Sequence, residues 1–259
     1  LIALTIFQAS LWISVYTLWQ HTARYNPDSW VVRSNLASGE EVERLFPAAK
    51  RDALASIAMH ELNPHAYLVL GSAELDMQNP AAAARALTRS VDLRPQSAAA
   101  WTRMGIAQSM LHNPDASETA YRHALDIDPD DETAWNNLVT LLANRHDYPD
   151  AKAAAQRAVA LQPASVSAHF NYGEMLLKTG EPAAAANQLR IALSLTPENH
   201  TVRLQLARTL VAAGDPAHAA IEYQRLLTED PNNSAARTEL HALQSPPPKN
   251  QPSLSKPQP

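Results

Sequence analysis

Small and apolar positions recur along this chain at a fixed spacing of 34 residues. The pattern runs without insertion or deletion through five units: Pro64–Ser97, Ala98–Asp131, Glu132–Ser165, Val166–Asn199 and His200–Asn233. The thirty-second place of each unit is always proline, at Pro95, Pro129, Pro163, Pro197 and Pro231. A fixed period of this length predicts stacked supersecondary units rather than one closed core.

Start and stop signals predict two helices, A and B, in each unit. The last residue of every unit can cap the next helix A: Ser97, Asp131, Ser165, Asn199 and Asn233. A second start lies in mid-unit, where proline follows an Asn or an acid, as at Asn79-Pro80 and Glu181-Pro182; the third unit shifts it to Pro149. Gly180 and Gly214 suit left-handed helix ends. We therefore predict an all-α fold.

Side-chain sizes within the unit predict how these helices pack. The eighth place is small or slender: Gly71, Gly105, Val139, Gly173 and Ala207. The twentieth is also small: Ala83, Ser117, Ala151, Ala185 and Ala219. Large residues fill other places, such as Tyr67, Trp101 and Trp135 at the fourth. Small residues opposite large ones at fixed offsets indicate interdigitating helices.

Two motifs in the second unit are specific enough to indicate a known family. Trp101-x-x-Met104-Gly105 and Ala124-Leu125-x-x-Asp128-Pro129 resemble those of the tetratricopeptide repeat family. The resemblance covers about two thirds of the chain and implies a right-handed α-solenoid of helix-turn-helix repeats. It implies little about function, because one fold of this kind serves many unrelated partners.

The N-terminal residues predict a membrane helix. Leu1–Gln20 contains no charged residue, has about the length that crosses a bilayer, and carries Trp12, Tyr16 and Trp19 toward its end. We expect a transmembrane helix here, the last of a truncated membrane region. One alternative is a helix docked on the solenoid, favoured by Gln8 and two serines; a cleaved signal peptide is weaker because no basic leader precedes it.

Residues 21–63 resemble a degenerate first repeat. Trp30 to Asn63 spans one period, but its internal prolines, Pro47 and Pro64, are 17 apart where Pro80 and Pro95 are 15 apart. We therefore expect a distorted unit. The junction of a hydrophobic helix with this unit is similar to the C-terminal part of multi-pass O-mannosyltransferase-like proteins. That resemblance implies repeats outside the cytoplasm, periplasmic or lumenal, and carries over no catalytic residue.

The C-terminal end is predicted to close the solenoid. Residues 234–244 begin a further helix A with polar positions, as a capping helix should. Residues 245–259 contain six prolines and predict a disordered tail.

Composition narrows the function further. The chain has no cysteine and a net charge of −5 with mixed signs, which excludes thiolate sites and gives no basic stripe for nucleic acid. His60-Glu61-Leu62-Asn63-Pro64-His65 has the wrong spacing for a zinc site, and Asp126–Asp131 lacks the glycine of a calcium loop. We expect no catalytic, cofactor or metal residues.

A peptide-binding surface is the remaining expectation. If the chain follows the family, the second, fifth, sixth, ninth and twelfth places of helix A face the concave side. The candidate residues are Arg103, Asn137, Asn171 and Gln205 at the sixth place, Thr102, Asn136 and Phe170 at the fifth, and Thr140, Glu174 and Arg208 at the ninth. Amides there can bond to both groups of a peptide backbone.

The sequence therefore predicts a membrane-tethered, non-enzymatic scaffold that binds polypeptide partners in its concave groove. Two alternatives stay open. One is the substrate-recruiting region of a membrane glycosyltransferase, and the other is a single-pass assembly adaptor in envelope or cytochrome biogenesis.

Overall fold

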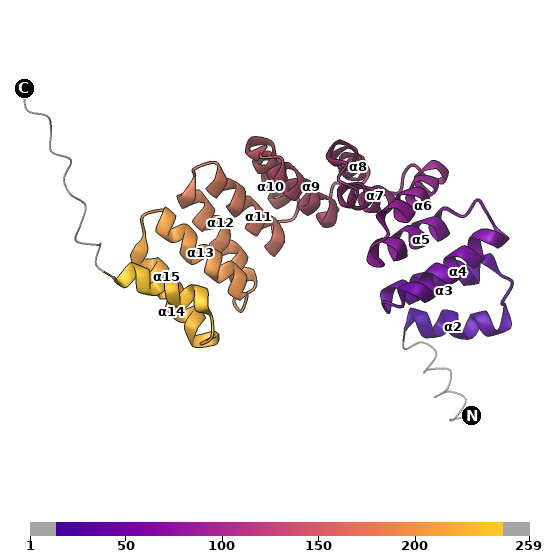
Figure 1. The fold of residues 1–259 in the computed structure, drawn as a ribbon, viewed down its shortest axis with the longest axis horizontal. Coiled ribbons are helices and arrows are strands. Elements are labelled where there is room, and N and C mark those ends of the chain that lie inside the picture. Colours follow the sequence, from indigo (N-terminus) through magenta and orange to yellow (C-terminus); the bar gives the residue numbers. More distant parts are fainter. Residues whose placement is uncertain (1–13, 246–259) are drawn as a thin grey trace, which may run out of the picture. The chain divides into compact units, whose positions relative to one another are not determined.

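The computed structural model describes residues 14–245, which form fourteen α-helices and no strand (Figure 1). The chain divides into two compact units, residues 1–147 and 148–259.

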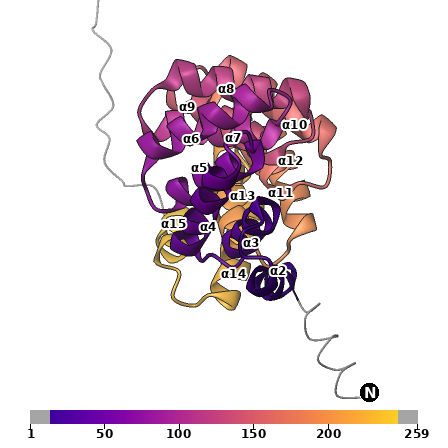
Figure 2. The same cartoon turned by 90° about the vertical axis from the view of Figure 1, so that its right-hand side faces the viewer.

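The N-terminal unit pairs each helix with its neighbour in sequence. Its helices are α2 (Val15–Tyr25), α3 (Trp30–Val42), α4 (Phe46–Met59), α5 (Pro64–Asp76), α6 (Pro80–Leu93), α7 (Ala98–Met110), α8 (Pro114–Ile127) and α9 (Glu132–Asn144). The A helices α3, α5 and α7 also contact one another in succession. In both views α2 lies beside α3 at one end of this unit (Figures 1 and 2).

The C-terminal unit continues the same arrangement. Its helices are α10 (Tyr148–Leu161), α11 (Val166–Lys178), α12 (Pro182–Leu195), α13 (His200–Ala212), α14 (Pro216–Glu229) and α15 (Ser234–Gln244). A core of Leu189, Leu206, Tyr223 and Leu226 joins α12 to α14, and Leu240 and Leu243 of α15 pack against it. Helix α15 thus has the bounds that were predicted for the capping helix, residues 234–244.

Helices repeat in phase from Trp30 onward, and the region predicted to be a degenerate first repeat contains one helix pair at the same spacing. Helices α3 and α4 begin 34 residues before α5 and α6 and have the same lengths, 13 and 14 residues. Pro47 occupies the second position of α4, as Pro149 does in α10. Proline suits either position of a first turn, so the shifted proline does not shift the helix.

The N-terminal helix differs from the expected span Leu1–Gln20. Ser14 is extended, caps α2 and forms a capping box with Thr17, so no single helix runs through it. Residues 1–13 of the expected span lie outside the described residues. Between residues 14 and 245 no helix has both the length and the apolar character needed to cross a bilayer.

Helix α2 instead packs closely on α3. A Cβ atom at Gly39 would lie 2.9 Å from Cα of Tyr16, so the two backbones almost touch. Helix α2 ends 34 residues before α4, where a preceding helix B would end. For its described part, the docked-helix alternative agrees with this packing.

The predicted helix starts are confirmed, but several B helices begin differently from the A helices. The five unit-ending residues accept a hydrogen bond from the third residue of the next helix A, as Asp131 does from Ala134. At helix B, Asn79 and Asn113 make no such bond, and their side-chain amides donate to Glu74 and Gln108 instead. Proline at the first position supplies the start signal there.

The fourth place of helix A has a role beyond the packing predicted for it. The indole N–H groups of Trp101 and Trp135 donate to the carbonyl oxygens of Pro95 and Pro129, each over 2.8 Å. Other residue types repeat this bond to the proline six residues earlier, namely Arg33, Arg203 and Arg237. These bonds satisfy the carbonyl at the turn from one repeat to the next.

Candidate peptide-binding groove

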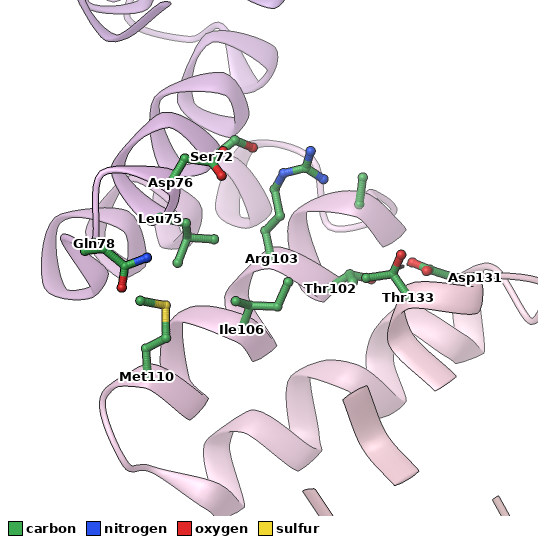
Figure 3. Close-up of a pocket in the computed structure, with 11 residues that line it drawn as sticks. Ser72, Leu75, Asp76, Gln78, Thr102, Arg103, Ile106, Met110, Asp131 and Thr133 are labelled. Carbon is green, nitrogen blue, oxygen red and sulfur yellow. Dashed lines mark hydrogen bonds between the residues drawn. The ribbon is translucent and has the colours of Figure 1, made fainter. Parts of the chain in front are cut away.

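The A helices of the N-terminal unit enclose a groove of about 510 Å³ (Figure 3). Helices α5 and α7 form its walls, and the start of α9 closes one end. The residues that line it and enter the argument below are Ser72, Leu75, Asp76, Thr102, Arg103, Ile106, Met110 and Asp131. Most stand at the fifth, sixth, ninth and twelfth places of a helix A, the face that the period directs inward.

One part of the groove is apolar. Leu75, Ile106 and Met110 face the same space from α5 and α7 (Figure 3). Aliphatic side chains and a flexible methionine can contact apolar side chains of varied shape. These residues were not among the candidates predicted from the sequence, although Leu75 stands at the twelfth place of α5 and Ile106 at the ninth place of α7.

Thr102 and Asp131 bond to each other at the end of the groove that the start of α9 closes. The buried Thr102 donates through Oγ1 to Asp131 Oδ2 over 2.6 Å, and Asp131 Oδ1 accepts from the backbone N–H of Ala134. Thr102 therefore lines the groove, but its hydroxyl already donates its hydrogen bond to Asp131.

Arg103 lines the groove and reaches across two repeats. Its Nη2 donates to Glu41 Oε1 of α3 over 3.0 Å, and about a third of its side chain is exposed. The guanidinium is thus held in place, and its charge is balanced by Glu41.

Ser72 supplies a polar group without a partner. The residue is 2% exposed, and its Oγ makes no hydrogen bond to any described residue. Figure 3 shows Ser72 beside the groove on α5. A buried hydroxyl without a partner is unfavourable, so a ligand group that bonds to it gains affinity.

The three candidate residues of α9 lie outside this groove. Thr140 is exposed and donates to the Asn136 carbonyl within its own helix. Asn137 is half-buried, and its side chain has no hydrogen bond within the described residues. Its amide is therefore free to bond to a ligand.

The candidates of the C-terminal unit have varied surroundings. Phe170 packs against the core, and Asn171 and Gln205 are half-buried. Burial raises the pKa of Glu174 despite the opposing charge of Lys178. Arg208 binds Glu239 of α15 through two guanidinium nitrogens, at 2.6 Å for the shortest contact.

That ion pair belongs to a larger contact. Tyr223 donates its hydroxyl to Glu239 over 2.7 Å. The bond from Arg208 holds the pKa of the Glu239 carboxyl below its usual range. Arg208 therefore fixes the terminal helix, a role that its spacing alone did not predict.

The segments that superficially suggested metals have structural roles. His60 ends α4 and its ring lies 4.5 Å from that of Trp30, while Asp131 caps α9. Within residues 14–245 no cluster of three or more His, Asp or Glu side chains is arranged to hold a metal ion.

Solved structures with a similar fold have little sequence in common with this chain. PilW, a type IV pilus biogenesis factor, has a TM-score of 0.70 at 18% identity over 82% of this chain and 98% of that one. YrrB, described as a TPR protein with an unusual peptide-binding site, has 0.56 at 14% over 71% and 95%. The hetero-tetramer Cut9–Hcn1 of APC/C has 0.69 at 17% over 89%, where this chain spans 46% of its length.

No curated protein sequence matches the chain. The similarity of the N-terminal junction to O-mannosyltransferase-like proteins therefore stays a prediction. The tetratricopeptide repeat model, in contrast, matches residues 68–132, 136–189 and 176–234, more than half of the chain. The chain belongs to the tetratricopeptide repeat family.

Proposed function

We propose that this protein is a scaffold that binds an extended polypeptide in the groove between α5, α7 and the start of α9. The observation that supports it best is the combination of an apolar surface with an unpartnered buried hydroxyl, Ser72, in one groove. A peptide can place an apolar side chain on Leu75 and Ile106 while its backbone bonds to Ser72. The Asn137 amide on α9, the next helix A, is a further polar group that can bond to the peptide backbone.

The test uses the full chain and a library of random nonapeptides. A peptide selected on the wild type is expected to bind the Ile106→Glu variant at least about tenfold more weakly, because a charge replaces an apolar contact. Asn137→Ala removes one hydrogen bond of about 0.5–1.5 kcal/mol and weakens binding severalfold at most. The matched control is Ile221→Glu, since Ile221 is 44% exposed on helix α14.

Full binding by folded Ile106→Glu would exclude this groove. Circular dichroism of each variant establishes that the helices are intact.

We also propose that the N-terminal segment tethers the protein to a membrane, with the repeats on the extracytoplasmic side. The support is the uncharged sequence Leu1–Gln20 alone. A chain that begins at Leu1 is expected in the membrane fraction, and one that begins at Ser14 in the supernatant. Equal distribution would exclude the tether.

The glycosyltransferase-associated and adaptor functions stay predictions of the sequence.

A further inference from the structure

We propose that the groove selects peptides in which a lysine or arginine stands next to an aliphatic residue. The inference rests on the proposed function and adds the chemistry of the partner. It follows from the charges that line the groove, from the position of its apolar surface and from the one carboxylate there that no described residue pairs.

The lining charges leave the groove negative. Asp76 and Asp131 contribute two carboxylates, and Arg103 contributes the single guanidinium. Glu41 already neutralises Arg103 across a 3.0 Å ion pair. A cationic ligand side chain therefore meets a favourable potential, whereas an acidic one meets two carboxylates.

Asp76 is the group best placed to hold that cation. It is the last residue of α5, is exposed, and has no hydrogen bond or ion pair with any residue between 14 and 245. Asp131, in contrast, already accepts two hydrogen bonds. A lysine or arginine of the ligand can bond to Asp76 without displacing an existing partner.

The apolar surface lines the same groove as this carboxylate. Leu75 precedes Asp76 on α5, and Figure 3 shows Leu75 facing Ile106 and Met110 of α7. Neighbouring ligand residues can thus contact the aspartate and the apolar surface together. Ser72, one helical turn earlier, is within the same groove and can bond to the ligand backbone.

This combination occurs in one repeat only. The place held by Asp76 is occupied in the other repeats by Val42, Met110, Asn144, Lys178 and Ala212. The selectivity is therefore a property of the α5–α7 repeat and not of the family's general pattern.

The experiment selects random nonapeptides on the full chain and compares the selected set with the unselected library. We expect enrichment of Lys or Arg next to Leu, Ile, Val or Met. For one synthesised binder, Asp76→Asn is expected to weaken binding about two- to fivefold, the range of an exposed ion pair. Asp92→Asn is the matched control, because Asp92 is an exposed aspartate of helix B α6 with no hydrogen bond or ion pair to any residue between 14 and 245.

Two outcomes would overturn the inference: a selected set without basic enrichment, or unchanged binding by Asp76→Asn. The Ile106→Glu variant separates the two proposals. Loss of binding in Ile106→Glu with no effect of Asp76→Asn retains the groove and overturns its preference for cations. Full binding by both variants overturns the groove as well.

Discussion

One glycine in each of several repeats decides how closely helix A approaches helix B, and these glycines are not equivalent. A Cβ atom at Gly105 would lie 2.5 Å from Cδ1 of Tyr121, whose ring is buried. At Gly173 the nearest atom would be Cγ of Leu189 at 3.0 Å. The contact at Gly105 is closer and meets an aromatic ring, so it forces a larger shift than the contact at Gly173, where Leu189 must give by only a few tenths of an ångström.

We therefore expect different effects from the same substitution. Gly105→Ala should lower the free energy of unfolding by about 1–3 kcal/mol through overpacking. Gly173→Ala should change it by less than about 1 kcal/mol, because the strain is offset by the better helix propensity of alanine. Urea denaturation of both variants checks this, and equal losses would contradict the packing described for Tyr121.

Glu40 is a second residue whose surroundings predict a measurable effect. It is 4% exposed beside Asp52, and Oε2 has no partner among the described residues. Glu74, at the same place one repeat later, pairs with Lys50 over 2.8 Å, but α2 presents Tyr16 where that lysine would stand. Burial, and then the charge of Asp52, raise the pKa of Glu40 to about 7, although Arg51 and Arg33 oppose the shift.

The sign of the pH dependence follows from this shift. Between the ordinary pKa of 4.5 and about 7, the folded chain holds a proton on Glu40 that the unfolded chain has released. The contribution of Glu40 to stability is complete below pH 4.5 and is lost as the pH rises through about 7. Glu40→Gln should remove this decline from the pH profile of unfolding, while the exposed Glu43→Gln should keep it; an unchanged profile in Glu40→Gln would contradict it.

At the scale of elements, the turns between repeats depend on the side chain at the fourth place of helix A. Trp101 donates to the Pro95 carbonyl, and Trp101→Phe should lower the free energy of unfolding by about 0.5–1.5 kcal/mol beyond the loss of indole packing. Tyr67→Phe is the control, because Glu61 replaces the proline in that repeat and the Tyr67 hydroxyl makes no hydrogen bond to any described residue. Equal effects in denaturation would mean that the bond does not contribute.

Helix positions could be predicted from the sequence because their signals are local. Caps and prolines mark the starts, so even the A and B helices of Trp30–Asn63 are in phase. The start of α2 was missed because Ser14 and Thr17, which form its capping box, lie in an apolar stretch. A first-turn proline fits two positions, so the shift of Pro47 by one place leaves the start of α4 in phase.

The groove could be predicted only in part. The period places a face of helix A inward, and Thr102 and Arg103 do line the groove. Their partners Asp131 and Glu41 lie 29 and 62 residues away, so no local pattern shows that these side chains are already engaged. The same holds for Arg208, whose partner Glu239 belongs to the terminal helix.

At the scale of the whole molecule, stability is a sum over neighbouring helices, because a solenoid has no central core. The last repeat therefore depends on α15, whose Leu240 and Leu243 pack against the cluster containing Tyr223 and Leu226. Arg208 and Tyr223 add polar bonds to Glu239 of the same helix. Helix α15 protects the apolar end of the C-terminal unit from water.

A chain that ends at Asn233 tests this dependence. Loss of the two leucine contacts should destabilise α13 and α14 by about 2–4 kcal/mol. In hydrogen exchange, the amides of these helices should exchange faster while those of α5 to α8 keep their protection, since only neighbours in the stack are coupled. A chain that ends at Ser245 is the control, because it retains α15. Faster exchange throughout both compact units would instead show that the molecule unfolds as a single cooperative body.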